Sequence, residues 1–245
     1  MKLTVLGKYG PYPGAGGACS GYLVENEGTR VLIDCGSGVL SRLQQICGIE
    51  DLDGVILSHL HGDHMSDMMI LRYALDIQTA RGLYNKGPLP VCLPGNPPEE
   101  YQRIASAQVF EPIVIESGME ISLGSLKFTF EEMTHPVQSF AVAVSNGTKH
   151  AVYTGDTNYN DKIAAFARDA DFFWADTGLL ERDLVKGKSP HLSADEVGKI
   201  AAEAGVKALM LSHIWPGYDE KELAGEAGRH YRNLFVAEEI KSYNI

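Results

Sequence analysis

The sequence lacks three features that would each indicate a particular class of protein. Its 245 residues contain no apolar run of transmembrane length, and the first residues, MKLTVLGKYGPYPG, lack the apolar stretch and small-residue cleavage site of a secretory signal. The four cysteines, at positions 19, 35, 47 and 92, include no C-x-x-C pair, which excludes a thiolate zinc knuckle and a thioredoxin-like motif. We therefore expect reduced thiols, a cytoplasmic location and no membrane partner.

A basic surplus is also missing. The 21 Lys and Arg residues stand against 32 Asp and Glu residues, which gives a formal net charge of −11. Because affinity for nucleic acids comes largely from Lys and Arg at the phosphates, this balance disfavours broad capture of DNA or RNA. At 44% hydrophobic and 22% charged residues the composition is that of a globular protein, and without repeats or low-complexity tracts we expect residues 1–245 to form a single domain.

Apolar patterning predicts strands and helices in both halves of the chain. Hairpin turns are expected at residues 26–28 and at Asn146–Gly147, each between two apolar strands. The segment DGVILSHL is apolar and β-branched, which is typical of a strand buried on both faces. Apolar residues at helical spacing predict helices within residues 38–48 and 66–79.

A further helix begins at a capping box. Ser193 is the expected N-cap, Glu196 stands three residues later, and the helix should end near Gly205. Strands that are apolar on both sides need cover on both faces, which a layered α/β fold provides. The sequence therefore predicts an α/β protein built as a four-layer αβ/βα sandwich.

The densest chemical feature follows the DGVILSH strand. His59, His61, Asp63 and His64 lie within six residues, although the whole chain has only eight histidines. Buried imidazoles each need a polar partner, and a metal ion supplies one to all of them. Neutral imidazoles with a carboxylate suit Zn²⁺, with Mn²⁺ or Fe²⁺ as alternatives that ligand type does not separate.

Other metal-binding residue types occur at the ends of predicted strands. His135 follows KFTFEEMT, Asp156 follows HAVYTG, His213 follows ALMLS, and Asp34 follows VLI. The carboxyl ends of similarly directed strands lie along one edge of a sheet, where ligands from distant segments can meet. We therefore expect these side chains to converge with the histidine-rich motif on one or two ions.

The order HLHGDH, THP, TGDT, LSH resembles the ligand motifs of the metallo-β-lactamase superfamily, of which H-x-H-x-D-H is the specific signature. The likeness covers nearly the whole chain and includes VLIDCGSG, which is similar to the first motif of that family. Within the superfamily, the His191-Leu192-Ser193 segment before a helix resembles ribonuclease Z and related phosphodiesterases, including a cyclic phosphodiesterase of phosphonate metabolism. The resemblance implies a four-layer αβ/βα sandwich of the metallo-β-lactamase type and a hydrolase that depends on two metal ions.

Carried over by position, the resemblance also implies a role for each ligand. One metal would be bound by His59, His61 and His135, the other by Asp63, His64 and His213, and Asp156 would bridge them. Paired cations lower the pKa of a shared water, so that hydroxide is available near pH 7 as the nucleophile. Asp63 would also orient that water.

Three residues outside the implied ligand set have possible further roles. The resemblance places His191 at the scissile phosphate, where a protonated imidazole would stabilise charge or protonate the leaving oxygen. Asp34 either supports a ligand imidazole or only stabilises a turn. Asp176 ends the strand ADFFWAD, and we interpret it as a turn or cap residue outside the site.

The spacing of two ligands decides among possible substrates. His135 and Asp156 are 156 − 135 = 21 residues apart, which leaves room for a hairpin but not for the arm with which short-form ribonuclease Z enzymes grip transfer RNA. With the net charge of −11, this favours a small or cyclic phosphodiester over RNA. Alternatives are a ribonuclease Z-like transfer RNA 3′-processing endonuclease, a thioesterase or lactonase, and a non-catalytic metal-binding module; family analogy further suggests a homodimer.

Overall fold

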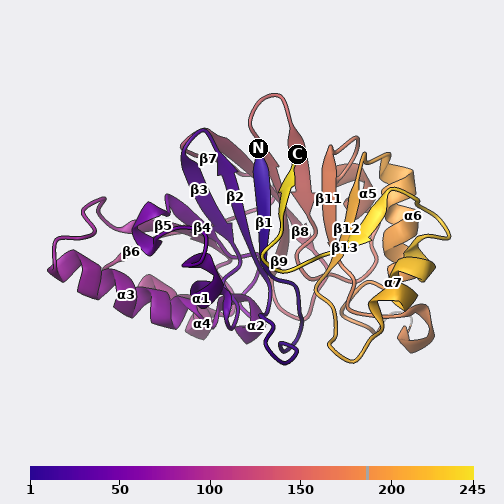
Figure 1. Ribbon diagram of the computed structural model, residues 1–245, viewed down its shortest axis with the longest axis horizontal. Helices are drawn as coiled ribbons and strands as arrows, with labels where there is room; N and C mark the ends of the chain where they lie inside the picture. Colours follow the sequence, from indigo (N-terminus) through magenta and orange to yellow (C-terminus); the bar gives the residue numbers. More distant parts are fainter. Residues whose placement is uncertain (186–187) are drawn as a thin grey trace.

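The computed structural model describes residues 1–185 and 188–245, and its centre is formed by two seven-stranded mixed sheets (Figure 1). In spatial order the first sheet contains β14 (Ser242–Asn244), β1 (Lys2–Gly7), β2 (Gly21–Asn26), β3 (Thr29–Ile33), β4 (Gly54–Ile56), β5 (Leu89–Leu93) and β6 (Phe110–Val114). The second contains β13 (Leu234–Val236), β12 (Leu209–Ser212), β11 (Phe172–Asp176), β10 (His150–Tyr153), β9 (Ser139–Ser145), β8 (Leu126–Met133) and β7 (Glu120–Leu123).

Each sheet is antiparallel on one side and parallel on the other. In the first sheet β14, β1, β2 and β3 pair antiparallel, whereas β3 to β6 run parallel. In the second sheet β10 to β13 run parallel, and β7 to β10 pair antiparallel. Parallel neighbours bring their carboxyl ends to the same edge, so the loops after β3, β4, β10, β11 and β12 are the segments placed to form a site.

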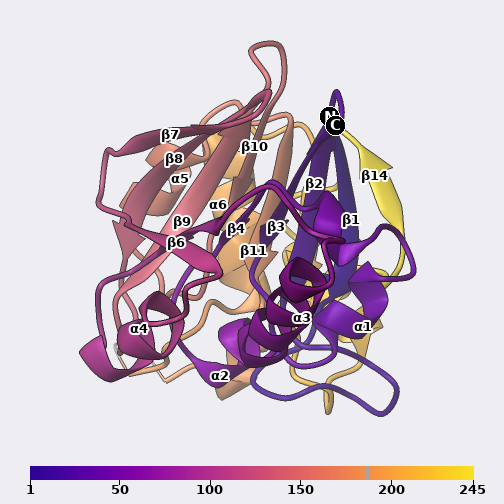
Figure 2. The same cartoon turned by 90° about the vertical axis from the view of Figure 1, so that its left-hand side faces the viewer.

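Helices cover the outer face of each sheet (Figures 1 and 2). They are α1 (Val39–Leu43), α2 (Gly62–Met65), α3 (Met68–Ala80), α4 (Pro98–Ala105), α5 (Lys162–Phe166), α6 (Ala194–Ala204) and α7 (Glu220–Ala227), with 3₁₀ helices at η1 (Ile49–Asp51) and η2 (Glu181–Asp183). Among the residues that the structure describes, no helix combines the length and the apolar character needed to cross a bilayer.

Three apolar cores fill the spaces between these layers. One lies between the first sheet and α1, α3 and α4, a second between the second sheet and α5, α6 and α7, and a third between the two sheets. In the central core the rings of Tyr153 and Trp174 stack with centroids 5.4 Å apart, and the Tyr22 hydroxyl bonds to Ser212 Oγ at 2.7 Å. The four-layer αβ/βα sandwich predicted from the sequence is confirmed.

Local sequence signals are also found where they were expected. The Ser193 hydroxyl accepts from the Glu196 backbone N–H, and α6 ends at Ala204 with Gly205 as its C-cap, at a φ of 66°. Asn146 and Gly147 begin the four-residue turn, 146–149, between β9 and β10. The helix predicted within residues 38–48 is shorter, because the Leu43 carbonyl accepts from both Ile46 and Cys47 and the chain continues in turns. All four cysteines are free thiols.

One carboxylate in the second sheet makes stability depend on pH. Asp171 accepts hydrogen bonds from Lys207 Nζ at 2.7 Å, the His150 backbone N–H at 3.0 Å and Lys149 Nζ at 3.2 Å. Burial opposes ionisation, but these donors lower the pKa of Asp171 to about 2. Since the folded pKa lies below the unfolded value, the stability that this group contributes is complete above about pH 4 and is lost as the pH falls towards 2.

We expect Asp171→Asn to lower the free energy of unfolding by about 1 kcal/mol at pH 7, a modest figure because the lysine partners are exposed. The difference from wild type should shrink as the pH falls below about 4. Urea denaturation of both proteins at several pH values measures it, with Asp76→Asn on the exposed face of α3 as control. A difference that is independent of pH would contradict this account.

Candidate metal centre

Polar residues that follow strands of both sheets lie close together at one edge of the sandwich. Six positions at or just after strand ends provide an imidazole or a carboxylate there: Asp34 after β3, His59 after β4, His135 after β8, Asp156 after β10, Asp176 at the end of β11 and His213 after β12. His61, Asp63 and His64 join them from the loop after β4 and from α2. The sequence predicts that several of these residues each follow a strand. The fold brings them together at one edge of the two sheets.

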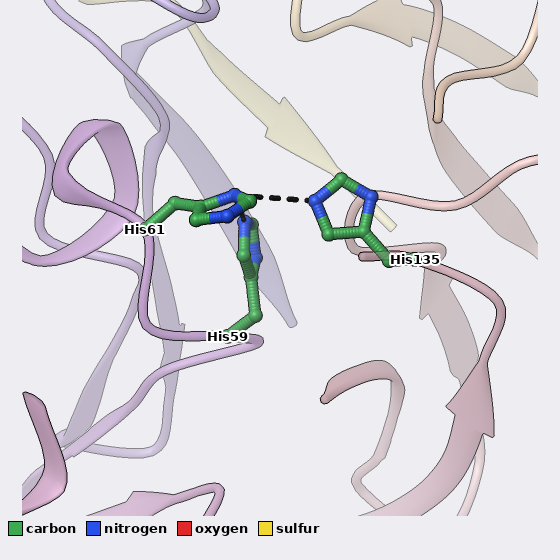
Figure 3. Close-up of side chains that lie close together, drawn as sticks. All are labelled: His59, His61 and His135. Carbon is green, nitrogen blue, oxygen red and sulfur yellow. Dashed lines mark hydrogen bonds between the residues drawn. The ribbon is translucent and has the colours of Figure 1, made fainter. Parts of the chain in front are cut away.

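Three imidazoles form a first cluster (Figure 3). His61 Nδ1 lies 3.1 Å from His59 Nε2 and 3.2 Å from His135 Nε2. Burial lowers the pKa of each of these histidines, which favours the neutral form that binds a metal. Nitrogens around a tetrahedral ion with bonds of about 2.0–2.1 Å lie about 3.3 Å apart, so the cluster has the dimensions of a zinc site.

A second cluster contains two carboxylates and two imidazoles. His213 Nε2 lies 3.3 Å from both Asp63 Oδ2 and Asp156 Oδ2, and His64 Nε2 lies 3.3 Å from Asp156 Oδ1 and 3.5 Å from Asp63 Oδ2. Asp156 also approaches the first cluster, with its Oδ2 3.6 Å from His59 Nε2. Its carboxylate therefore lies between the two groups, where a bridging ligand would stand.

Unpaired buried atoms support a metal fit in the second cluster. His64 Nε2 and Asp156 Oδ1 are buried and have no hydrogen-bond partner among the described residues. Burial favours neutral imidazoles, yet Asp156 and the neighbouring carboxylates raise the pKa of His64 and raise that of His213 to about 10. The excess of negative charge that causes these shifts is the charge that cations would neutralise.

The outer nitrogens of two clustered imidazoles, those of His64 and His135, are held by further groups. His64 Nδ1 donates to Asp34 Oδ2 at 2.7 Å, and Ser58 fixes that carboxylate through its backbone N–H at 2.7 Å and its hydroxyl at 2.9 Å. His135 Nδ1 donates to the Pro190 carbonyl at 3.1 Å, which leaves Nε2 free to face the cluster. Such outer partners set the tautomer and orientation of ligand histidines. Of the two roles expected for Asp34, the structure shows the contact with an imidazole of the second cluster.

Asp176 corrects our sequence interpretation, which left it outside the site. Its Oδ2 accepts from His191 Nδ1 at 2.9 Å, and its Oδ1 lies 3.3 Å from His213 Nδ1. Burial disfavours the imidazolium, but Asp176 raises the pKa of His191 above its usual value. Asp176 and His191 are 191 − 176 = 15 residues apart, and parallel pairing of β11 with β10 and β12 places this strand end beside the other ligands. The position of Asp176 at the end of a strand was the sequence feature that could have indicated its role.

The backbone beside the second cluster requires a glycine. A Cβ on Gly10 would lie 1.9 Å from His213 Nε2, and His213 is buried with a φ of 54°, so the ring has no free space into which to move. Left-handed backbone is unusual for a histidine and fixes its direction further.

Gly10→Ala should therefore displace a ligand. We expect metal affinity at the second cluster to fall about 10–100-fold, the range seen when ligand orientation is lost. Titration of the demetallated protein with Zn²⁺ measures it, with Gly62→Ala as the control, since a Cβ there meets nothing within 4 Å. Equal affinities for Gly10→Ala and wild type would contradict the placement of His213 Nε2.

Trp215 lies two residues beyond His213 of the second cluster. Its indole Nε1 donates to the Tyr12 hydroxyl at 2.8 Å. Tyr12 lines a hollow of about 470 Å³ that also reaches His61 and Asp63. A second hollow, of about 510 Å³, begins at His61 and extends to Arg103 on α4. The centre is thus open on this side to molecules of modest size.

Comparison with known proteins identifies the family. Residues 29–214 match the model described as "Beta-lactamase superfamily domain". The protein is 34% identical over 214 residues to "Probable metallo-hydrolase YhfI" of Bacillus subtilis, with 87% of each chain covered. It is also 26% identical to a ribonuclease Z of Bradyrhizobium diazoefficiens, with 97% of each chain covered. The chain belongs to the β-lactamase superfamily and is a metallo-hydrolase of that superfamily.

Solved structures agree with this assignment. The crystal structure of Bacillus subtilis YhfI superimposes with a TM-score of 0.92 at 30% identity, covering 99% of both chains. The short form of human tRNase Z superimposes with a TM-score of 0.79 at 19% identity, covering 100% of this chain and 99% of that one. The second likeness is one of fold.

Proposed function

We propose that this protein is a phosphodiesterase that acts on a small or cyclic phosphodiester and uses two divalent cations, preferentially Zn²⁺. The observation that carries the proposal is the His191–Asp176 pair at 2.9 Å, which adjoins Asp156 and His213 of the second cluster. A carboxylate-bound imidazole placed there can donate a proton to an alkoxide leaving group. A thiolate leaves without such help, so the pair favours phosphodiesters over thioesters.

Each of the two clusters would hold one cation. His59, His61 and His135 would hold one cation, and Asp63, His64 and His213 the other, with Asp156 between them. When bound, the two cations supply an attacking water of lowered pKa and positive charge for the phosphate oxygens. Asp63 would orient the water, and His191 would protonate the leaving oxygen from its Nε2 side while Asp176 holds Nδ1.

Three observations favour a small substrate over transfer RNA. The segment between His135 and Asp156 consists of β9, a turn and β10, with no arm for gripping RNA. The net charge of −11 opposes a long polyanion. The hollows beside the centre, of about 470 and 510 Å³, suit a molecule of nucleotide size.

The test is hydrolysis of bis(p-nitrophenyl) phosphate by protein of measured metal content, beside a thioester, a lactone, cyclic nucleotides and a precursor transfer RNA. We expect phosphodiester turnover that depends on metal, without processing of the RNA. Faster turnover of the thioester or lactone would transfer the protein to an acyl hydrolase branch. Inactivity on every substrate at full metal loading would favour a binding module.

A further inference from the structure

A third hollow lies on the side of the centre where His191 stands. Its volume is about 270 Å³, and its lining includes Tyr159 from the loop after β10, Leu184 and Val185 from the segment after η2, and His191 itself. Among the lining residues that the structure describes, His191 alone belongs to a group of close metal-binding side chains, which it forms with Asp156, Asp176 and His213. It is therefore a separate space that shares one wall, His191, with the reacting centre.

The walls of this hollow are apolar and exposed. Tyr159 is 46% exposed and Val185 is 55% exposed, although both lie beside a polar centre. Single exposed apolar residues are common on protein surfaces and need no explanation. Here they line one concave space next to the group that would protonate a leaving oxygen, which is the arrangement of a small-molecule pocket.

The loop that carries Tyr159 is fixed to the site on both sides. The Asn158 backbone N–H donates to the Thr134 carbonyl at 2.9 Å, next to the ligand His135. The Thr157 backbone N–H donates to Asp176 Oδ2 at 3.1 Å, and Asn160 Nδ2 donates to Thr157 Oγ1 at 3.1 Å. The backbone that carries Tyr159, 159 − 156 = 3 residues beyond Asp156, is thus held beside the centre.

The charges around the hollow limit what it can hold. None of the lining residues that the structure describes is a lysine or an arginine, and the charged group among them other than His191 is Glu196. A second phosphate would be repelled by this carboxylate, and no cationic side chain among the described lining residues would offset the repulsion. An uncharged ring would instead cover the apolar walls, while Asn158 and Glu196 offer polar groups to its edge.

We propose that this hollow binds an uncharged planar ring carried by the leaving group of the phosphodiester, with Tyr159 stacked against it. The assignment to the leaving group rests on the proposed function, because His191 lines the hollow. In the reaction the oxygen of water bonds to phosphorus and loses a proton to solvent. The bond from phosphorus to the ring-bearing oxygen breaks, and that oxygen keeps the electron pair and receives a proton. An acyclic diester gives a phosphomonoester and an uncharged hydroxyl compound, whereas a cyclic diester gives one phosphomonoester that carries the new hydroxyl.

Two substrates with the same leaving group test the assignment. Bis(p-nitrophenyl) phosphate and methyl p-nitrophenyl phosphate both release p-nitrophenolate and differ in the group that stays on phosphorus. Tyr159→Ala should lower kcat/KM about tenfold on both, mainly through KM, because one ring–ring contact is lost. Tyr159→Phe should stay within about twofold of wild type, since it keeps the ring. Tyr73→Ala, which removes an exposed tyrosine on α3, is the control.

The outcomes that overturn the proposal are distinct. Unchanged kinetics of Tyr159→Ala on both esters would exclude a ring site, and a loss confined to the bis ester would place the ring on the group that stays. A binding measurement separates this proposal from the proposed function. Saturation-transfer NMR should detect phenol, but not cyclohexanol, on wild type and not on Tyr159→Ala. Phenol binding without phosphodiester turnover would overturn the proposed function alone, whereas turnover without phenol binding would overturn the ring site alone.

Discussion

Asp156→Ala is expected to lose bound metal and activity together. The Asp156 carboxylate lies between the clusters, 3.3 Å from His64 Nε2 and from His213 Nε2 and 3.6 Å from His59 Nε2. Without it the imidazoles have no shared anion to hold two cations close to each other. Because metal-ion catalysis supplies several kcal/mol of transition-state stabilisation, phosphodiester turnover should fall at least about 10³-fold.

Metal analysis of the purified variant and its hydrolysis rate check this expectation. Asp76→Ala, which removes an exposed carboxylate from α3, is the matched control and should keep wild-type metal content. Normal metal-dependent turnover by Asp156→Ala would refute the two-metal assignment. Loss of metal with retained activity would show that the hydrolysis does not use these cations.

His191→Ala should keep its metal and lose turnover. His191 lies outside the two clusters proposed to hold the cations and forms a third group with Asp156, Asp176 and His213. Its Nδ1 is bound to Asp176 at 2.9 Å, which occupies the nitrogen that faces that group. Loss of a general acid costs about 10²–10⁴-fold in rate. The loss should be greatest for a substrate with an alkoxide leaving group, such as a cyclic nucleotide, and smaller for p-nitrophenolate, which needs less help from a proton donor.

This dependence on the leaving group distinguishes an acid from a residue that only shapes the site. The comparison requires kcat for both substrates at equal metal loading, with His230→Ala as control, because that imidazole is bonded to Asp195 between α6 and α7. An equal loss on both substrates would assign His191 a role in shape or binding instead of proton transfer. Loss of metal in His191→Ala would place this residue among the ligands.

Several elements of the fold could be predicted because their signals are local. The Ser193–Glu196 capping box, the turn at residues 146–147 and the apolar strand before His59 each depend on residues a few positions apart. Strand order could not be predicted in this way. Pairing β1 with β14 joins residues 2–4 to residues 242–244, and no periodicity in the sequence encodes a contact at that separation.

The candidate site could likewise be predicted only in part from the sequence. The types of ligand and their positions after strands could be inferred, and the structure gathers those side chains in the two clusters. Asp176 was missed because a carboxylate at the end of a strand is more often a turn or cap residue, and its contact with His191 depends on the lateral order of β10, β11 and β12. The hollow beside His191 was not predicted either, because Tyr159 and Val185 belong to loops that meet only in the folded chain.

What the sequence alone determined was the chemistry available to this protein: imidazoles and carboxylates placed after apolar strands, in the order of a metal-hydrolase family, with too short a segment between His135 and Asp156 for an RNA-binding arm. The tertiary structure decided which atoms face one another. It placed the Asp156 carboxylate between two clusters, joined Asp176 to His191, and formed a hollow beside the latter. Distances between side chains depend on strand order and on packing between the sheets. Strand order and sheet packing are set by burial of apolar residues along the whole chain, not by any local pattern.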